Sequence, residues 1–171
     1  RKTLFKLLER LLIRFADLVV VVSAPIEHWY HKSYPGIRTV LVRNFPKGSR
    51  PPTKSTRLRE RFAIPDSHKL FLYQGILSTN RNLELIFETF SRAPRDRELV
   101  VMGYGPSIDW AKRAAAASDN IHFCDAVPPE EVVSYAAEAD IGLALVEPAV
   151  CLSHEYALTN KMLTSLVAGV P

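Results

Sequence analysis

The sequence predicts an α/β protein, with a Rossmann-like parallel sheet flanked by helices. Four apolar runs have the length of buried strands, and helical patterns separate them along the chain. The strands are expected at residues 69–73, 99–102, 121–123 and 141–146, and the helices at 83–90, 108–117, 129–137 and from Met162 onward. Strands that alternate with helices in this way are typical of a parallel sheet with right-handed crossovers.

The composition excludes several classes of protein. The chain has 171 residues, 47% of them hydrophobic and 23% charged, as in an ordinary globular protein. Its net charge of +4 is mild, and no block of lysine and arginine indicates a nucleic-acid partner. The 2 cysteines are too few for a disulfide framework, which indicates a reducing, cytoplasmic setting. No apolar run approaches the ~18 residues of a membrane span, and no signal peptide is evident.

The first helical pattern, at residues 4–15, is strongly amphipathic. Leucines and Phe15 share one broad face, and basic side chains occupy the other. Packing against a neighbouring part of a larger protein is the main interpretation. A peripheral contact with a membrane surface is the alternative, because basic amphipathic helices also bind there.

The next segments lead to a domain boundary. They predict a strand buried on both faces at 18–23, a helix at 26–31 capped by Ser23, and a strand at 39–42. A stretch rich in proline and glycine follows at 45–52 and is the place expected for a linker. We therefore predict two domains, residues 1–46 and residues 47–171. The chain begins without methionine inside a helical pattern and has no strand after its last helix, so we expect truncation at both ends.

The loops at the carboxyl ends of the strands carry the functional prediction, because ligands of open α/β sheets bind there. Gly75 and Arg81 follow the first of the four strands, and Gly103 and Gly105 follow the second. Glycine lets the backbone approach a ligand, and the planar charged fork of arginine suits phosphate. After the fourth strand, Lys161 stands in the first turn of a helix, where a cation is unfavourable unless an anion binds beside it. These loops together predict a phosphorylated ligand.

Other ligands are not indicated. The glycine turn at 103–107 lacks the third glycine of the dinucleotide fingerprint, because Ile108 stands in its place, and no P-loop sequence is present. His28 and His31 lie one helical turn apart without a third ligand, so no metal site is expected. His122, on a short apolar strand, is interpreted as a core residue.

The ordered series of these motifs resembles the second half of a GT-B glycosyltransferase. The segments that carry the resemblance are Gly75 with Arg81, residues 101–106, 121–123 and 135–140, and Thr159-Asn160-Lys161 with the final 168–171. The pattern is similar to the family of retaining, nucleotide-sugar-dependent enzymes called family 4, or glycosyl transferases group 1. Residues 16–23 and 43–46 similarly resemble the end of that family's first domain and the crossing into its second.

The resemblance assigns donor-site roles by position. The residues so assigned are Gly75, Arg81, Gly103, Gly105, Phe123, Val127, Asn160, Lys161 and Thr164. Arg81 corresponds to the basic residue that holds the diphosphate, and the two later glycines to the turn beside the nucleotide. Residues 123–127 correspond to the loop that contacts the base through its backbone. Asn160 and Lys161 match an Asn-Lys pair found in a subset of the family.

The sequence departs from the family pattern at two places. Where the family has two glutamates that bracket the last loop, the second contacting the ribose, this chain has Tyr156 and Thr164, with Glu155 one position away. Ile76 stands where many members have a second arginine. Within the last loop, His154 and Glu155 are the candidates for acid–base catalysis.

The resemblance implies a glycosyltransferase fragment, metal-independent and without a cofactor, whose substrate is a UDP- or GDP-linked sugar. It would transfer a hexose in glycan biosynthesis to a glycan, lipid or polyprenyl acceptor bound by the other domain, in the cytoplasm or at the cytoplasmic face of a membrane. The isolated fragment is expected to be inactive. The alternatives are a nucleotide-sugar epimerase on the same scaffold and a non-catalytic GT-B-like binding module, which the missing glutamates allow.

Overall fold

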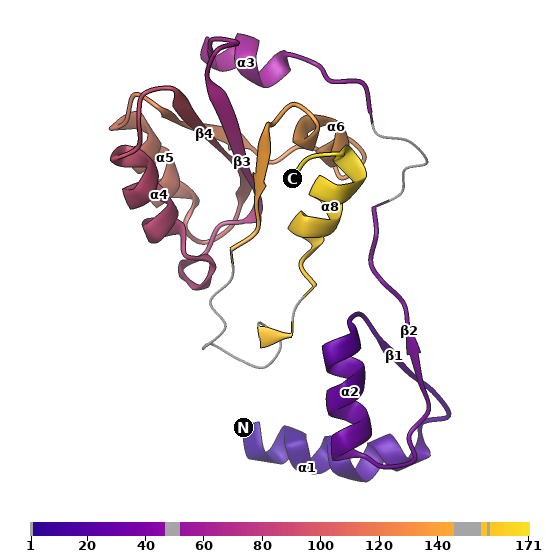
Figure 1. Cartoon of the computed structure of the whole chain (residues 1–171). Helices are drawn as coiled ribbons and strands as arrows, with labels where there is room; N and C mark the ends of the chain where they lie inside the picture. Colours follow the sequence, from indigo (N-terminus) through magenta and orange to yellow (C-terminus); the bar gives the residue numbers. More distant parts are fainter. Residues whose placement is uncertain (1, 47–51, 146–154, 157) are drawn as a thin grey trace. The chain divides into compact units, whose positions relative to one another are not determined.

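The computed structural model describes residues 2–46, 52–145, 155–156 and 158–171 (Figure 1). The chain divides into two compact units. The first unit consists of Arg1–Asn44 and Tyr156–Leu158, and the second of Phe45–Glu155 and Thr159–Pro171. The division therefore falls at the start of the stretch in which the sequence places a linker. None of the described helices combines the length and the apolarity that crossing a membrane requires.

The first unit is a small βαβ arrangement preceded by a helix. Its elements are α1 (Lys2–Leu12), the 3-10 helix η1 (Ile13–Phe15), β1 (Val19–Val21), α2 (Ala24–Ser33) and β2 (Thr39–Leu41). β1 and β2 pair in parallel. As predicted, Ser23 caps α2: its hydroxyl oxygen accepts the Ile26 amide at 3.4 Å, and Pro25 lies in the first turn.

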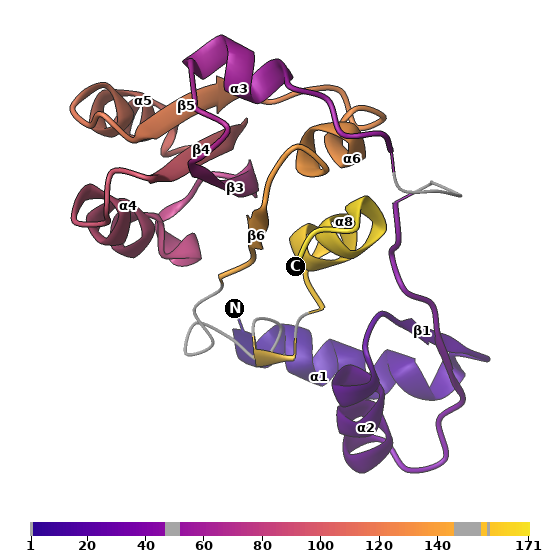
Figure 2. The same ribbon diagram turned by 45° about the horizontal axis from the view of Figure 1, so that its top comes forward.

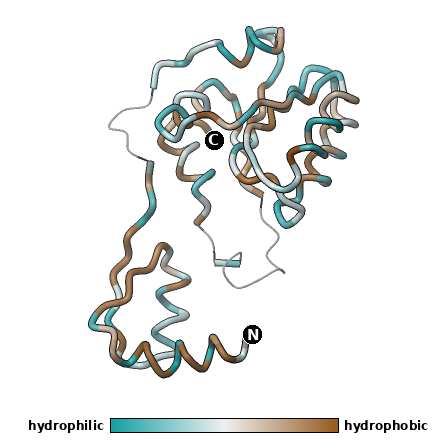
Figure 3. Tube along the Cα trace, turned by 180° about the vertical axis from the view of Figure 1, so that it is seen from behind, coloured by the Kyte–Doolittle hydropathy of each residue, from teal (hydrophilic) through white to brown (hydrophobic). Residues whose placement is uncertain are grey.

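The apolar face of α1 is exposed in the first unit, where brown and teal segments alternate along the helix (Figure 3). The polar side approaches α2, since burial and then the nearby Glu9 carboxylate raise the pKa of Tyr30. The other side of α1 exposes leucines and Phe5, and Phe15 in the following η1 is 78% exposed. The prediction of a strand buried on both faces at 18–23 is wrong here, because Val20 is 60% exposed and no described segment covers it. The two observations indicate that this unit presents an uncovered apolar surface.

The second unit contains the predicted parallel sheet. Its elements are α3 (Arg57–Phe62), β3 (Lys69–Ile76), η2 (Thr79–Arg81), α4 (Leu83–Ser91), β4 (Arg97–Tyr104), α5 (Ile108–Ala116), β5 (Ile121–Asp125), α6 (Val132–Ala136), β6 (Ile141–Leu143) and α8 (Asn160–Ala168). All strands of the 4-stranded sheet run parallel, in the order β5-β4-β3-β6. The predicted α/β class, with helices flanking a parallel sheet, is confirmed.

Helices cover both faces of this sheet (Figure 2). Side chains alternate along β3, so that Tyr73 packs with residues of α4 and α5, while Leu70 and Leu72 pack with residues of α6 and the end of α8. β6 is an edge strand, and its residues are only half-buried. The prediction of a strand buried on both faces at 141–146 is therefore wrong for 141–145, and Val146 lies outside the described residues.

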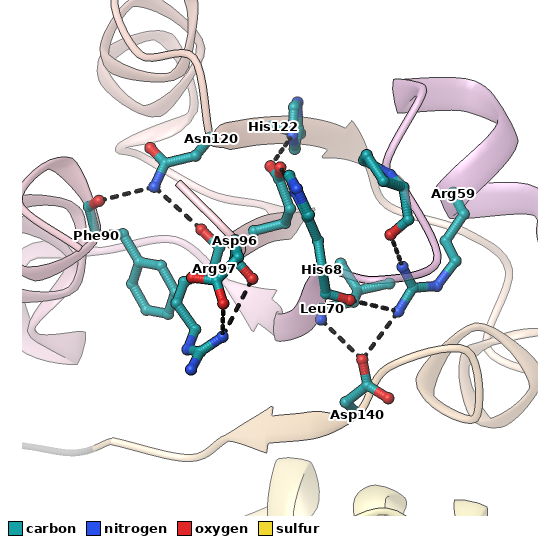
Figure 4. Close-up of polar contacts among 11 residues, drawn as sticks. Arg59, His68, Leu70, Phe90, Asp96, Arg97, Asn120, His122 and Asp140 are labelled. Atoms are coloured by element: carbon teal, nitrogen blue, oxygen red, sulfur yellow. Dashed lines mark hydrogen bonds and ion pairs between the residues drawn. The ribbon is translucent and has the colours of Figure 1, made fainter. Parts of the chain in front are cut away.

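Polar contacts hold the amino-terminal edge of the sheet (Figure 4). The Asp140 carboxylate accepts a hydrogen bond from the Arg59 guanidinium at 2.9 Å. The buried Glu98 carboxylate lies between two imidazoles, 2.8 Å from His68 Nδ1 and 2.8 Å from His122 Nε2. His122 thus has a structural place in the strand, as the sequence indicates. These contacts lie at the end of the strands opposite to the candidate site.

Candidate functional site

A pocket of about 150 Å³ opens at the carboxyl ends of β3 and β4, on the face that α6 and α8 cover. Its lining residues are Gln74, Gly75, Met102, Gly103, Tyr104, Ala126, Val127, Val132, Asn160, Lys161 and Thr164. All of them belong to the second unit. A pocket of this size is smaller than typical sites for whole drug-sized ligands, so a nucleotide-sized ligand would fill it with one part only.

The glycines of the pocket are required by the close approach of two strands. Gly103 and Gly75 are partners in the parallel register of β3 and β4. A Cβ at Gly103 would lie 1.9 Å from the Gly75 carbonyl oxygen, which no side chain can tolerate. Gly105 has φ +140°, and a Cβ there would lie 2.5 Å from the Leu77 carbonyl oxygen. The absence of side chains leaves the strand ends open beside α8.

Lys161 places a positive charge beside these glycines. Thr159 caps α8, its hydroxyl oxygen accepting the Met162 amide at 3.4 Å, and this places Lys161 in the first turn. The ammonium donates to the Tyr73 hydroxyl at 2.9 Å and lies 4.1 Å from the centre of the Tyr73 ring. A Cβ at Gly75 would be 3.6 Å from Nζ. The Tyr73 hydroxyl donates in turn to the Ile76 carbonyl oxygen at 3.0 Å, so the lysine is held at the end of β3.

The electrostatics of this lysine are unusual. Burial, and then the neighbouring Arg81 guanidinium, lower the pKa of Lys161 to about 8. Burial also raises the pKa of Tyr73 to about 12, with Arg81 acting in the opposite direction. Among the described residues, no carboxylate lies within ion-pair distance of Lys161 or Arg81. Two neighbouring cations at a helix start form a site where an anion binds favourably.

Arg81 approaches from the loop after β3. It ends η2, and Asn82, with φ 54°, separates that turn from α4. Its influence on both Lys161 and Tyr73 shows that the guanidinium is near the ammonium, although Arg81 does not line the pocket itself. The two basic residues predicted for phosphate are thus brought together from loops far apart in the sequence.

The predicted donor-site residues fall into two groups. Those in the pocket lining are Gly75, Gly103, Val127, Asn160, Lys161 and Thr164; those outside it are Arg81, Gly105 and Phe123. The Phe123 side chain lies on the other face of the sheet, where Lys112 Nζ is 4.9 Å from its ring centre. The hydroxyl of Thr164 donates to the Asn160 carbonyl oxygen at 2.8 Å, so its proton is already engaged within α8.

The candidates for acid–base catalysis have no defined place in the pocket. Glu155 is exposed and does not line it. His154 lies outside the described residues. In the described part of the chain, no group of three or more His, Cys, Asp or Glu could hold a metal ion.

Sequence reasoning missed several lining residues, of which Gln74 is the most informative. Its side chain is 5% exposed, and its Oε1 atom has no hydrogen-bond partner among the described residues. The signal was present, since Gln74 is a polar residue within a buried central strand. Met102, Tyr104 and Ala126 lie within the segments 101–106 and 123–127 that the resemblance covers, although sequence reasoning assigned them no role of their own. Val132 carried no signal, because an apolar residue in a helix is ordinarily a core residue.

The chain is similar to known proteins in structure but not in sequence. No protein-family model matches the chain, and no curated protein sequence is significantly similar to it. HepE from Anabaena, in complex with UDP-glucose, matches 97% of this chain with a TM-score of 0.71 and 15% identity, over 46% of its own length. TarM from S. aureus, in complex with fondaparinux, alpha-GlcNAc-glycerol and UDP, matches 94% with a TM-score of 0.66 and 10% identity, over 30% of its length.

WaaG, a glycosyltransferase involved in lipopolysaccharide biosynthesis, matches 89% of the chain with a TM-score of 0.59 and 18% identity. The chain has the fold of a GT-B half. It spans less than half the length of HepE, TarM and WaaG. The GT-B fold predicted from the sequence is confirmed, and identities this low show the fold alone.

Proposed function

We propose that the second unit binds the nucleotide diphosphate of a nucleotide-sugar donor, as one half of a GT-B glycosyltransferase. The observation that carries the proposal is the half-buried Lys161 ammonium, beside Arg81 and at the start of α8, without a carboxylate partner among the described residues. Such a cluster stabilises a multiply charged anion. The GT-B fold supports a nucleotide-linked anion, because HepE and TarM were solved with UDP or UDP-glucose.

The proposed chemistry is transfer of a hexose, with retention of configuration, to an acceptor held by another part of the protein. Negative charge builds on the diphosphate as the bond to the sugar breaks. Lys161 and Arg81 would stabilise that charge with fixed cations, the role that a metal ion fills in other enzymes, so the proposed transfer is metal-independent. No cofactor beyond the UDP- or GDP-linked substrate is proposed.

Isothermal titration calorimetry with UDP, GDP and their glucose and mannose conjugates tests the proposal. We expect one of the nucleotides to bind this chain, and Lys161→Met to weaken it by about tenfold or more, since hydrogen bonds to charged groups contribute about 1.5–3 kcal/mol. No heat from any of these compounds would contradict it and favour a non-catalytic module. The solved structures that this chain resembles give no support to the epimerase alternative.

A contact between α1 and a membrane surface is a second, separate proposal. The exposed apolar face of α1, with its basic residues, favours it. Co-sedimentation of the chain with anionic lipid vesicles tests it, and Leu11→Glu together with Phe15→Glu should abolish binding. If the wild-type chain and the double variant both stay in the supernatant to the same extent, the apolar face of α1 serves packing against protein instead.

A further inference from the structure

The pocket is lined by a residue whose buried amide oxygen has no hydrogen-bond partner in the described part of the chain. Gln74 is 5% exposed and lines the pocket between Met102, its register partner on β4, and Gly75. Its Oε1 atom is buried and has no hydrogen-bond partner among the residues that the structure describes. Buried polar groups in folded proteins are almost always paired, so an unpaired one within a pocket points to a missing ligand.

The chemistry of the amide restricts that ligand. A glutamine carbonyl oxygen only accepts hydrogen bonds, and its amino group only donates them. A diphosphate at neutral pH offers acceptors but no donors, so it cannot satisfy Oε1. A hydroxyl both donates and accepts, and it can therefore pair with either end of the amide.

The position of Gln74 restricts the ligand further. The next residue, Gly75, lies directly beside the Lys161 ammonium, since a Cβ there would be 3.6 Å from Nζ. Gln74 and Lys161 also line the same pocket, so a group that binds Gln74 is adjacent to an anion that binds Lys161. In a nucleotide sugar, hydroxyl-bearing sugars flank the diphosphate on both sides, the ribose on one and the transferred sugar on the other.

We infer that Gln74 is a specificity-determining residue of the donor site, whose amide forms a hydrogen bond with a sugar hydroxyl next to the diphosphate. This inference rests on the proposed function. It adds a residue that recognises the sugar component, distinct from the cations that recognise the phosphates. An apolar side chain at this position would fill the same space between β3 and α8 but leave the hydroxyl unpaired.

The test uses Gln74→Met, which keeps the length of the side chain and removes its polarity, with pyrophosphate, UDP and UDP-glucose as probes. Calorimetry should show UDP or UDP-glucose binding weakened by about three- to tenfold, the range for one neutral hydrogen bond, and pyrophosphate binding unchanged. Loss with UDP assigns the ribose hydroxyl, and loss confined to UDP-glucose assigns the transferred sugar. GDP and GDP-mannose replace the uridine probes if calorimetry selects guanosine.

Asn120→Leu provides the matched control. The Asn120 amide is satisfied, since Nδ2 donates to the Phe90 carbonyl at 2.9 Å and the Arg97 carbonyl at 3.0 Å, at the other end of the strands (Figure 4). Its removal should lower the thermal midpoint and leave nucleotide affinity unchanged. Gln74→Met should raise the midpoint of the empty protein, because an unpaired buried group is removed.

The outcomes separate this inference from the proposed function. Suppose that the wild-type protein binds a nucleotide sugar. If Gln74→Met binds that nucleotide sugar equally well, or if the substitution lowers the affinity for pyrophosphate by the same factor as the affinity for UDP-glucose, the inference is wrong and the proposed function stands. If the wild-type protein binds none of the probes, both are overturned.

Discussion

At the scale of single residues, the central feature of the site is a lysine whose buried positive charge destabilises the folded protein. The pKa of Lys161 falls from 10.5 to about 8 on folding. The unfolded chain therefore binds more protons than the folded chain between these values, and the free energy of unfolding rises with pH across this window. Below about pH 8 the protonated lysine opposes folding. A bound diphosphate would reverse that effect.

The affinity for a nucleotide should consequently depend on pH. We expect binding of UDP-glucose or GDP-mannose to weaken as the pH rises through about 8, because free Lys161 loses its charge there. Calorimetry between about pH 6.5 and about pH 9 measures this. Lys161→Met should bind weakly, without the decline near pH 8. A decline of the same size in the variant would assign the titration to another group.

Tyr73 is expected to act as a positioning residue for that lysine. Tyr73→Phe removes the oxygen that accepts from Nζ at 2.9 Å and keeps the ring. The ammonium then loses a partner, so the decline of affinity should move to lower pH and affinity at neutral pH should fall by about two- to tenfold. Tyr135→Phe is the control, because Tyr135 does not line the pocket and its ring centre lies 3.9 Å from the Arg57 guanidinium instead. An unchanged pH profile in Tyr73→Phe would show that the hydroxyl serves packing only.

Part of this site is visible in the sequence at the level of residues. Lys161 is predictable because a cation in the first turn of a helix conflicts with the helix dipole. The contact between Lys161 and Tyr73 is not predictable, because the two residues are 88 positions apart in the sequence and only the folding of the sheet brings them together. The sequence predicts that Gly103 is a glycine because a ligand approaches it. In the structure, Gly103 must be a glycine because a side chain there would collide with the carbonyl oxygen of Gly75. Sequence patterns identify a glycine but not the atom that excludes a side chain.

At the scale of elements, the site depends on where α8 begins. Its first turn supplies Asn160 and Lys161, and its C-terminus ends at Gly169, with φ 72°, as the sequence predicts.

The core helices and strands of the second unit are predictable because each has a periodicity and a turn signal. The degree to which β6 is buried is not predictable, because an edge strand and a central strand of a parallel sheet have the same apolar composition.

The cap of α8 should therefore matter for both stability and binding. Thr159→Ala removes the oxygen that accepts the Met162 amide, and it should lower the free energy of unfolding by about 1 kcal/mol. Nucleotide affinity should fall as well, since Lys161 is two residues away. Thr159→Ser keeps the cap and should behave like the wild type in denaturation and calorimetry. Destabilisation of equal size by serine would show that the threonine methyl group, not the cap, is responsible.

At the scale of the whole molecule, the chain contains one half of a GT-B fold and an uncovered apolar surface on its first unit. HepE, TarM and WaaG are each more than twice as long as the part that matches this chain. A transferase needs an acceptor beside the donor, and the candidate pocket lies entirely within the second unit. The proposed function therefore separates binding of a donor from transfer of its sugar.

The chain by itself is expected to bind a donor without transferring the sugar. Incubation with UDP-glucose or GDP-mannose and candidate lipid or glycan acceptors should release no nucleoside diphosphate above the buffer background, as measured by a coupled assay. The Lys161→Met variant provides the background for enzyme contaminants. Release that depends on acceptor and on Lys161 would mean that the residues present suffice for transfer.

The most direct test of the central claim is an amide-resolved NMR titration of this chain with UDP and, separately, GDP. We expect the amide signals of Gly75, Gly103 and Lys161 to shift with one saturation curve for one of the nucleotides, while the amide signals of α2 stay in place. The same titration of Lys161→Met should need at least about tenfold more ligand. Shifts confined to other residues, or none at all with either nucleotide, would contradict the assignment of this pocket as a donor site.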